Sequence, residues 1–97
     1  MAQRTIIEHP DFTKTRDAMQ LNARRFDEIM EGVGAALATR PTYFPQVPNT
    51  RGRLRSLRTE PFLPGEPSYL IYFSHNNKEV ILEDLYYAYP EDGAGLD

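Results

Sequence analysis

Residues 69–89, YLIYFSHNNKEVILEDLYYAY, decide the fold of this 97-residue chain. Two runs rich in β-branched and aromatic residues, Tyr69–His75 and Glu79–Tyr89, flank a short polar segment that contains two asparagines. Asparagine tolerates the positive φ angles of a tight turn, so this pattern predicts an antiparallel hairpin. A third β-prone run, Arg53–Glu60, precedes the hairpin and extends it to a meander of three predicted strands.

The N-terminal half favours one short strand and two helices. Arg4–Glu8 is β-prone and ends before His9-Pro10, because the residue before a proline is disfavoured in the helical region. Asp11 is then the predicted cap of a helix from about Phe12 to Leu21. A stronger helical period follows over Ala23–Thr39. Apolar residues recur there at i, i+3, i+4, i+7 and i+11: Phe26, Ile29, Met30, Val33 and Leu37.

These elements predict an α+β fold, in which a small antiparallel sheet carries both helices on one face, in the order β-α-α-β-β-β. The first strand is expected at an edge of this sheet or beside one of the later strands. Residues 40–50 hold three prolines and are expected to form an extended connector, and residues 61–67 an exposed loop. The length suits a single domain over residues 1–97, with a short acidic tail from about residue 90 that is expected to be flexible.

Composition excludes several kinds of site. The chain has no cysteine, which excludes disulfides, thiolate metal sites and cysteine nucleophiles. Its two histidines, His9 and His75, are too far apart in the sequence for a metal-ligand motif, so neither a metal nor a cofactor is predicted. No apolar run approaches the roughly 18 residues of a membrane span, and residues 1–4 lack the apolar segment of a signal peptide. We therefore expect a cytoplasmic protein with no membrane contact.

Charge is distributed unevenly along the chain. Residues 1–59 hold ten Lys or Arg and six Asp or Glu, a balance of +4, whereas residues 60–97 hold one Lys and eight acids, a balance of −7. Four arginines of the basic part fall within eight residues: Arg51, Arg53, Arg55 and Arg58. Clustered guanidinium groups suit the binding of phosphate or carboxylate, because the planar fork donates two parallel hydrogen bonds. Strand alternation places Arg53 and Arg55 on one face, a row that Arg51 could extend, and Arg58 on the other face unless a bulge intervenes.

Element order and two short stretches resemble a known family. The chain resembles the RelE/ParE/HigB superfamily of bacterial toxins in its order of elements: a short strand, a helix that opens with His-Pro-Asp-Phe, and a second amphipathic helix. It also resembles this superfamily in two stretches of the strands that follow, Gly52-Arg53-Leu54-Arg55 in one and Tyr69-Leu70-Ile71-Tyr72 in the next. The resemblance covers roughly residues 4–89. It implies a RelE-like fold and a toxin of a type II toxin–antitoxin pair, neutralised by a cognate antitoxin protein.

The resemblance also implies an activity. RelE-like members are endoribonucleases that cleave messenger RNA, usually on the ribosome and without a metal, and so inhibit translation. ParE-like members inhibit DNA gyrase instead. By position, Arg53 and Arg55 match the family's basic, phosphate-binding residues of the second strand, and Tyr72 matches an aromatic residue of the third.

Cleavage of RNA at its own 2′-hydroxyl needs a base, a cation at the scissile phosphate and an acid for the leaving 5′-oxygen. We predict Arg53 and Arg55 as the catalytic cations, with Tyr87 or Tyr89, which share a strand face, for proton transfer. RNA binding is predicted for the arginine run and one more aromatic residue: Arg51, Arg53, Arg55, Arg58 and Tyr72.

Each assignment has a structural alternative. The arginines can instead pair with acids of the last strand (Glu79, Glu83, Asp84), and tyrosines are ordinary strand residues that fill the edge of a core. His75 titrates in a range suited to acid–base catalysis, but it is also expected as an exposed turn residue. The family's last strand often ends in basic residues, whereas this chain has Tyr86-Tyr87-Ala88-Tyr89. A gyrase inhibitor and a non-catalytic protein-interaction module on the same fold therefore stay open.

Overall fold

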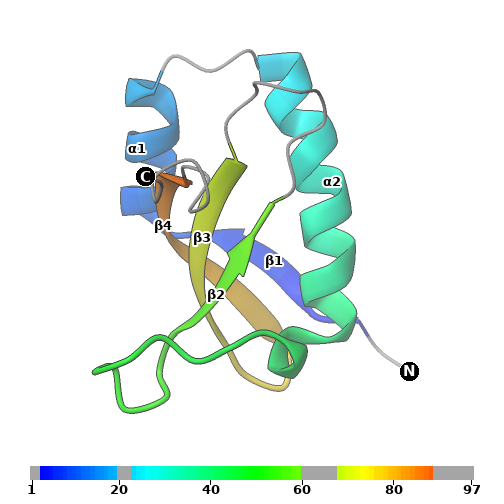
Figure 1. The fold of residues 1–97 in the computed structure, drawn as a ribbon. Coiled ribbons are helices and arrows are strands. Elements are labelled where there is room, and N and C mark those ends of the chain that lie inside the picture. The colour runs from blue at the N-terminus through cyan, green and yellow to red at the C-terminus, as the bar shows by residue number, and fades with distance from the viewer. Residues whose placement is uncertain (1–2, 20–22, 60–67, 89–97) are drawn as a thin grey trace, which may run out of the picture.

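The computed structural model describes residues 3–19, 23–59 and 68–88. Its elements follow the predicted order, with one added 3₁₀ turn: β1 (Thr5–Glu8), α1 (Pro10–Ala18), α2 (Ala23–Thr39), η1 (Pro41–Tyr43), β2 (Arg55–Arg58), β3 (Ser68–His75) and β4 (Glu79–Ala88). Figure 1 shows the four strands as one twisted sheet accompanied by two helices, an α+β architecture. The loop predicted at 61–67 and the tail predicted from residue 90 lie outside the described residues.

The sheet is mixed rather than antiparallel throughout. Its strand order is β1-β4-β3-β2, and β2, β3 and β4 form the predicted antiparallel meander. The first strand lies at the edge and pairs with β4 in parallel, from Thr5 opposite Glu79 to Glu8 opposite Leu82. The prediction of an antiparallel sheet is therefore wrong for β1. Both helices and two strands separate β1 from β4 in the chain, so no hairpin turn fixes their relative direction.

Alternation along β3 divides the sheet into two faces. Tyr69, Ile71 and Phe73 are buried, whereas the residues between them are only partly buried. An irregularity in the pairing of β3 with β4 lets Leu82 and Leu85 both lie in register with this buried row. The other side, called the open face below, carries the alternate residues and their partners in register: Ser56, Arg58, Leu70, Tyr72, Ser74, Ile81, Asp84 and Tyr86.

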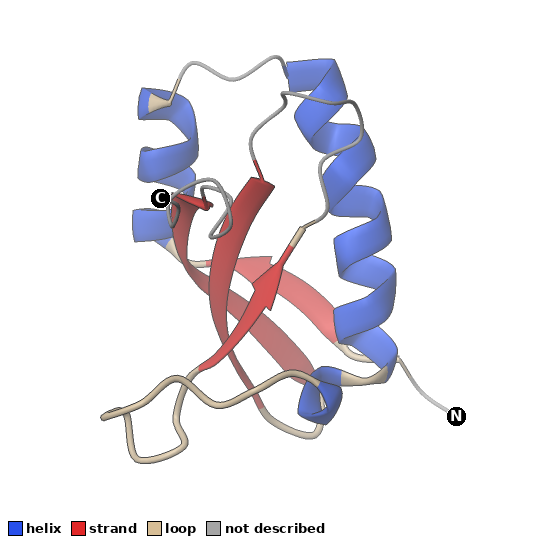
Figure 2. Cartoon of the chain, viewed as in Figure 1, coloured by secondary structure: helices blue, strands red, loops and turns tan. Residues whose placement is uncertain are grey.

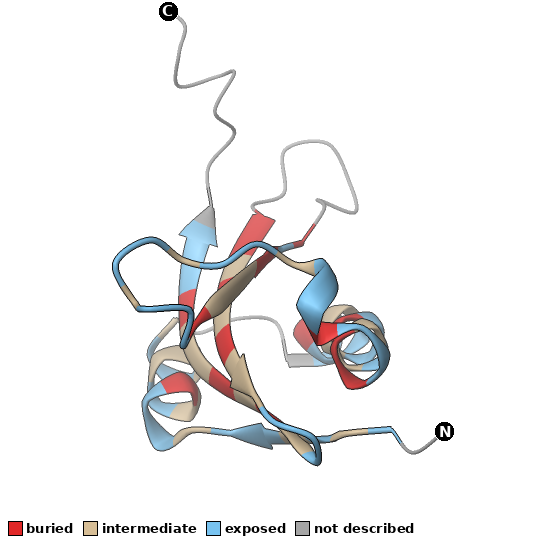
Figure 3. Cartoon of the chain, turned by 90° about the horizontal axis from the view of Figure 1, so that it is seen from below, coloured by how far each residue is buried: buried red, intermediate tan, exposed pale blue. Residues whose placement is uncertain are grey.

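Both helices bury apolar side chains in the same core. Phe12 of α1 and Phe26 and Leu37 of α2 belong to one cluster with Ile71 and Phe73 of the sheet. Full burial of side chains of this size contributes about 1.5–3 kcal/mol each. Figure 3 shows the buried residues of the two helices turned toward the sheet. The periodic stripe therefore holds α2 in place, and this helix has the predicted bounds.

The first helix starts two residues earlier than predicted. His9 is its N-cap, because the His9 Nδ1 accepts a hydrogen bond from the Asp11 N–H at 3.0 Å. Pro10 occupies the first helical turn, where its missing N–H removes no intrahelical bond. Asp11 is therefore not the cap; it lies inside the first turn, where a carboxylate interacts favourably with the helix dipole.

The connector after α2 covers part of the outer edge of β2. Its chain pairs back on that strand, since the Val47 N–H donates to the Leu54 carbonyl at 2.9 Å and the Ser56 N–H donates to the Pro45 carbonyl at 3.0 Å. Figure 2 shows this segment as a long loop that leaves η1 and returns to β2. The pairing satisfies backbone groups that an edge strand would otherwise present to solvent.

Candidate nucleic-acid interface

The arginine run does not form a single row on a strand. Asn49, Arg51 and Gly52 have φ angles of 67°, 56° and 76°, so the chain makes a left-handed turn at this point. The Arg53 N–H closes the turn on the Thr50 carbonyl at 3.0 Å. Because of this turn β2 begins only at Arg55, and the prediction that Arg53 lies in the same strand is wrong.

The Arg55 side chain is hydrogen-bonded to the backbone of the connector. Its Nη1 donates to the Phe44 carbonyl at 2.6 Å and lies 3.4 Å from the Thr42 carbonyl. In the sheet Arg55 is opposite Phe73, a buried residue, and its side chain is half-buried. The guanidinium therefore holds η1 against the sheet, in addition to any contact with a ligand.

Arg53 takes part in a weak ion pair. Its Nη1 lies 3.8 Å from Oε2 of Glu83, and 63% of the Arg53 side chain is exposed. The same carboxylate oxygen accepts a hydrogen bond from the Ser74 hydroxyl at 2.7 Å. The structural alternative of arginine–acid pairing is thus observed for Arg53, where exposure limits its contribution to about 0–1 kcal/mol.

Arg51 and Arg58 lie at the two ends of the run. Arg51 is exposed in the left-handed turn, away from any strand. Arg58 ends β2 in register with Leu70, on the open face, as the strand period predicted. The four arginines therefore point into different surroundings and do not converge on one phosphate.

The tyrosines also divide between two places. Tyr72 and Tyr86 meet on the open face with ring centroids 5.3 Å apart, and Tyr72 is in register with Asp84. Burial, then Asp84 and Tyr72, raise the pKa of the Tyr86 hydroxyl, which keeps this phenol protonated. Tyr87 is opposite Tyr69 on the other side of the sheet, with ring centroids 5.8 Å apart. Tyr89 lies outside the described residues.

The predicted catalytic cation and the predicted proton donor are far apart along the sheet. Arg55 is aligned with Phe73 and Tyr87 with Tyr69, four residues away on β3. At about 3.3 Å per residue this separates the two backbone positions by about 13 Å along the strand. The structure does not bring Arg55 and Tyr87 together at one scissile bond.

A different set of cations gathers at the end of the molecule that holds the β3–β4 turn. This set, called the basic end below, comprises Arg4, Arg40, Arg55 and Lys78. The Arg4 N–H donates to the Ala38 carbonyl at 3.2 Å, and its Nε donates to the Asn76 carbonyl at 2.7 Å. Arg4 thus joins the end of α2 to the turn. Sequence reasoning missed this set because its members come from four distant segments.

His75 is half-buried at the end of β3, so the prediction of an exposed turn residue is wrong. Its Nδ1 is enclosed and has no hydrogen-bond partner within the described segments. Burial first, and then the guanidinium groups of Arg4 and Arg55, lower the pKa of the imidazole. Neutral His75 therefore lies beside two fixed positive charges.

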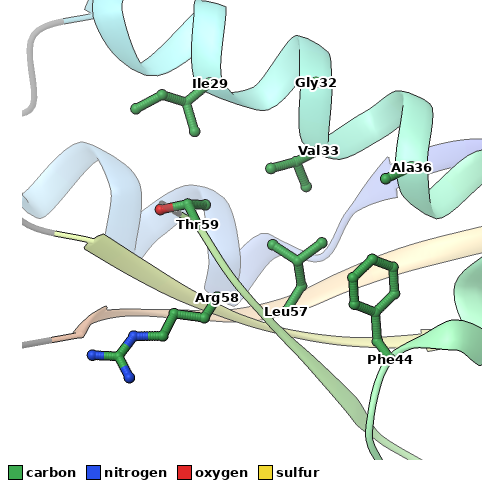
Figure 4. Close-up of a pocket in the computed structure, with 8 residues that line it drawn as sticks. All are labelled: Ile29, Gly32, Val33, Ala36, Phe44, Leu57, Arg58 and Thr59. Atoms are coloured by element: carbon green, nitrogen blue, oxygen red, sulfur yellow. The ribbon is translucent and has the colours of Figure 1, made fainter. Parts of the chain in front are cut away.

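An apolar cavity of about 370 Å³ lies on another part of the surface, between α2 and β2 (Figure 4). Small residues of the helix, Gly32 and Ala36, leave this space, and Leu57 and Phe44 form its opposite wall. A Cβ atom built on Gly32 would meet no other atom within 4 Å. Arg58 and Thr59 also border the cavity, and in Figure 4 the side chain of Arg58 points away from it, so the cavity has no constellation for acid–base catalysis.

None of the helices in the described segments is both long and apolar enough to cross a membrane. No group of three or more His, Cys, Asp or Glu side chains in those segments is arranged to hold a metal ion.

Comparison with known proteins adds no assignment. No model of a known protein family matches the chain, and no curated protein sequence matches it. Function is therefore inferred from the residues and their geometry.

Proposed function

We propose that this protein is the toxin-like component of a type II toxin–antitoxin system, with a RelE/ParE-type fold and messenger RNA as its target. The observation that carries the proposal is the order β-α-α-β-β-β over the described residues, which is the order that the resemblance implies. Of the two stretches behind the resemblance, residues 69–72 lie in β3, whereas residues 52–55 precede β2 and reach only its first residue.

Metal-independent cleavage of messenger RNA is the proposed activity. RNA supplies its own nucleophile, so the protein has to position the strand, stabilise charge at the phosphate and move a proton. Arginine is present in excess around the start of β2, and tyrosine hydroxyls lie on β3 and β4. Translation then stops because its template is cut, and a cognate antitoxin is the expected partner that prevents this.

The separation of Arg55 from Tyr87 favours a second candidate on the same fold, a toxin-like protein that binds its target without cleaving it. Gyrase inhibition and a non-catalytic interaction module both belong to this class. For such a protein the sheet needs a binding surface and no aligned acid–base pair. The two candidates predict different cellular products, which makes them separable.

Induced expression in a bacterial host tests the proposal. Growth should stop when the protein is made alone and resume when a small open reading frame beside its gene, encoding the antitoxin, is expressed with it. Primer extension should then show new 5′ ends within messenger RNA. Growth arrest with intact transcripts and altered DNA supercoiling would favour gyrase inhibition, and harmless expression would refute a toxin.

A charge-matched pair of variants links toxicity to the arginine run. Arg53→Gln with Arg51→Gln removes two exposed cations near β2, whereas Lys14→Gln with Arg24→Gln removes two exposed cations from the helices. The first pair should weaken transcript cleavage, and the second should leave it unchanged. Equal cleavage by both variants would exclude the run from the RNA-binding surface.

A further inference from the structure

Cations from four separate segments lie at one end of the molecule. Arg4 precedes β1, Arg40 follows α2, Arg55 begins β2 and Lys78 lies in the β3–β4 turn. Hydrogen bonds hold the segments together, since the Thr5 N–H donates to the Lys78 carbonyl at 2.9 Å, the Arg4 N–H donates to Ala38 and the Arg4 Nε donates to Asn76. Figure 1 places η1, the start of β1 and the β3–β4 turn at the same end.

The positive charge of the basic end is not neutralised by ion pairs inside the described segments. The carboxylate pairs found there involve other cations, namely Arg16 and Arg53. Arg4 and Arg55 instead donate to backbone carbonyls, which leaves their net charge in place. Burial first, and then the charges of Arg4 and Arg55, lower the pKa of His75, so its neutral imidazole does not add to or offset the charge of this end. A positive potential attracts a polyanion.

One aromatic side chain at this end is largely exposed to solvent. Tyr43, in η1, is 77% exposed, and its ring contacts Phe44 edge to face at a centroid distance of 5.4 Å. Phe44 in turn contacts the buried Phe73 at 6.1 Å. The Tyr43 N–H also donates to the Arg40 carbonyl at 3.1 Å, and Arg55 binds carbonyls on either side of it. An exposed ring on a fixed turn is a platform on which a base can stack.

We propose that the basic end binds single-stranded RNA, with phosphates on Arg4, Arg40 and Lys78 and one base stacked on Tyr43. The proposal rests on the proposed action on RNA and moves its main contact from Arg51 and Arg53, in the turn before β2, to the basic end. Cations spread over several segments suit a chain of phosphates better than one free phosphate. Stacking on the exposed Tyr43 ring requires a base that is not paired in a duplex, which favours a single strand. Seen from this end, Figure 3 shows the β3–β4 turn and η1 after its buried Pro41 as exposed.

A fluorescent variant tests the stacking contact. The chain has no tryptophan, so Tyr43→Trp introduces a single indole at the basic end, and Tyr86→Trp introduces one on the open face as the matched control. A short single-stranded RNA should quench the first variant and leave the second unchanged. Tyr43→Ala should lower RNA affinity about tenfold, as expected for loss of one stacked base. Quenching at Tyr86→Trp alone would overturn the proposal.

A charge-matched pair tests the phosphate contacts. Arg40→Gln with Lys78→Gln should reduce the slope of log affinity against log salt concentration by about 1.4, which is 0.7 for each lost contact with a single strand. Lys14→Gln with Arg24→Gln, the same change in net charge on α1 and α2, should leave the slope unchanged. Equal slopes for the two variants would overturn the proposal.

Two more measurements separate this proposal from the proposed function. Competition by inorganic phosphate as effective as that by RNA would show a simple anion site and overturn the proposal, as would equal binding of duplex RNA. If expression cuts transcripts while Arg40→Gln with Lys78→Gln leaves cutting intact, the toxin function stands and the basic end is excluded. If the purified protein binds RNA at Tyr43 but expression is harmless, RNA binding at the basic end is supported and the toxin function is refuted.

Discussion

The imidazole of His75 lies half-buried at the end of β3, with the guanidinium groups of Arg4 and Arg55 near it. Burial and these two charges lower its pKa, so the unfolded chain holds the proton more tightly than the folded one. The free energy of unfolding should therefore rise with pH up to the ordinary histidine value of about 6.5 and fall as the pH drops below it. Urea unfolding across this range measures the effect.

NMR titration of the His75 ring supplies the direct check on this assignment. The pKa should lie below the ordinary value in the native protein and rise toward it in Arg4→Gln, because one of the two cations is then removed. A His75 pKa at or above the ordinary value would contradict the arrangement of Arg4 and Arg55 around the ring.

Gly52 has a φ of +76°, in the left-handed region that residues with a Cβ atom adopt only at a cost. Gly52→Ala should therefore lower the free energy of unfolding by about 1 kcal/mol, because left-handed backbone costs roughly 1–2 kcal/mol for other residues. The added Cβ would lie 3.5 Å or more from Gln46, so backbone strain and not a clash causes the loss. Chemical denaturation measures it, and an unchanged stability would argue against this turn.

Gly32 gives the opposite expectation within a helix. A Cβ atom there meets nothing within 4 Å, and the residue lies in the interior of α2. Gly32→Ala should raise the free energy of unfolding by about 1 kcal/mol, because alanine is the better helix former by that amount. The same denaturation experiment measures it. A loss of stability would mean that the cavity beside Gly32 is filled in the folded protein.

At the scale of elements, Arg55 fixes how η1 meets the sheet. A charged donor bonded to a backbone carbonyl contributes about 1.5–3 kcal/mol, and partial exposure places Arg55 at the low end. Arg55→Met should thus lower the free energy of unfolding by about 1–2 kcal/mol, whereas Arg51→Met, in the exposed turn, should change it by less than about 0.5 kcal/mol. Equal effects of the two changes on urea unfolding would contradict this role.

The elements also differ in how far the sequence predicted them. The bounds of α2 were predicted because a helical period is a local signal along the chain. The start of β2 was predicted two residues too early, because Asn49 and Arg51 adopt a left-handed turn. Their residue types allow such a turn but do not predict it. The parallel pairing of β1 with β4 depends on contacts between distant segments, which no local pattern encodes.

For the molecule as a whole, the candidate site was predicted only in part. The arginine run was visible because its members are neighbours in the sequence, and folding then separated Arg53 from Arg55. The basic end was not visible, since Arg4, Arg40 and Lys78 become neighbours only through the sheet and the end of α2. Exposure of Tyr43 is likewise a property of the folded connector and not of its proline-rich sequence.

Net charge opposes RNA binding at the basic end, because the whole chain carries −3. Removing residues 90–97 deletes three carboxylates (Glu91, Asp92, Asp97) and brings the formal charge to zero, since 11 acids then balance 11 bases. This truncation should tighten RNA binding at 0.01 M salt, where the screening length is about 30 Å, and should have little effect at 1 M, where it is about 3 Å. Glu91→Gln, Asp92→Asn and Asp97→Asn together should act in the same way without shortening the chain. Titration of a labelled single-stranded RNA measures both variants, and an affinity that is unchanged at low salt would show that long-range charge does not govern binding.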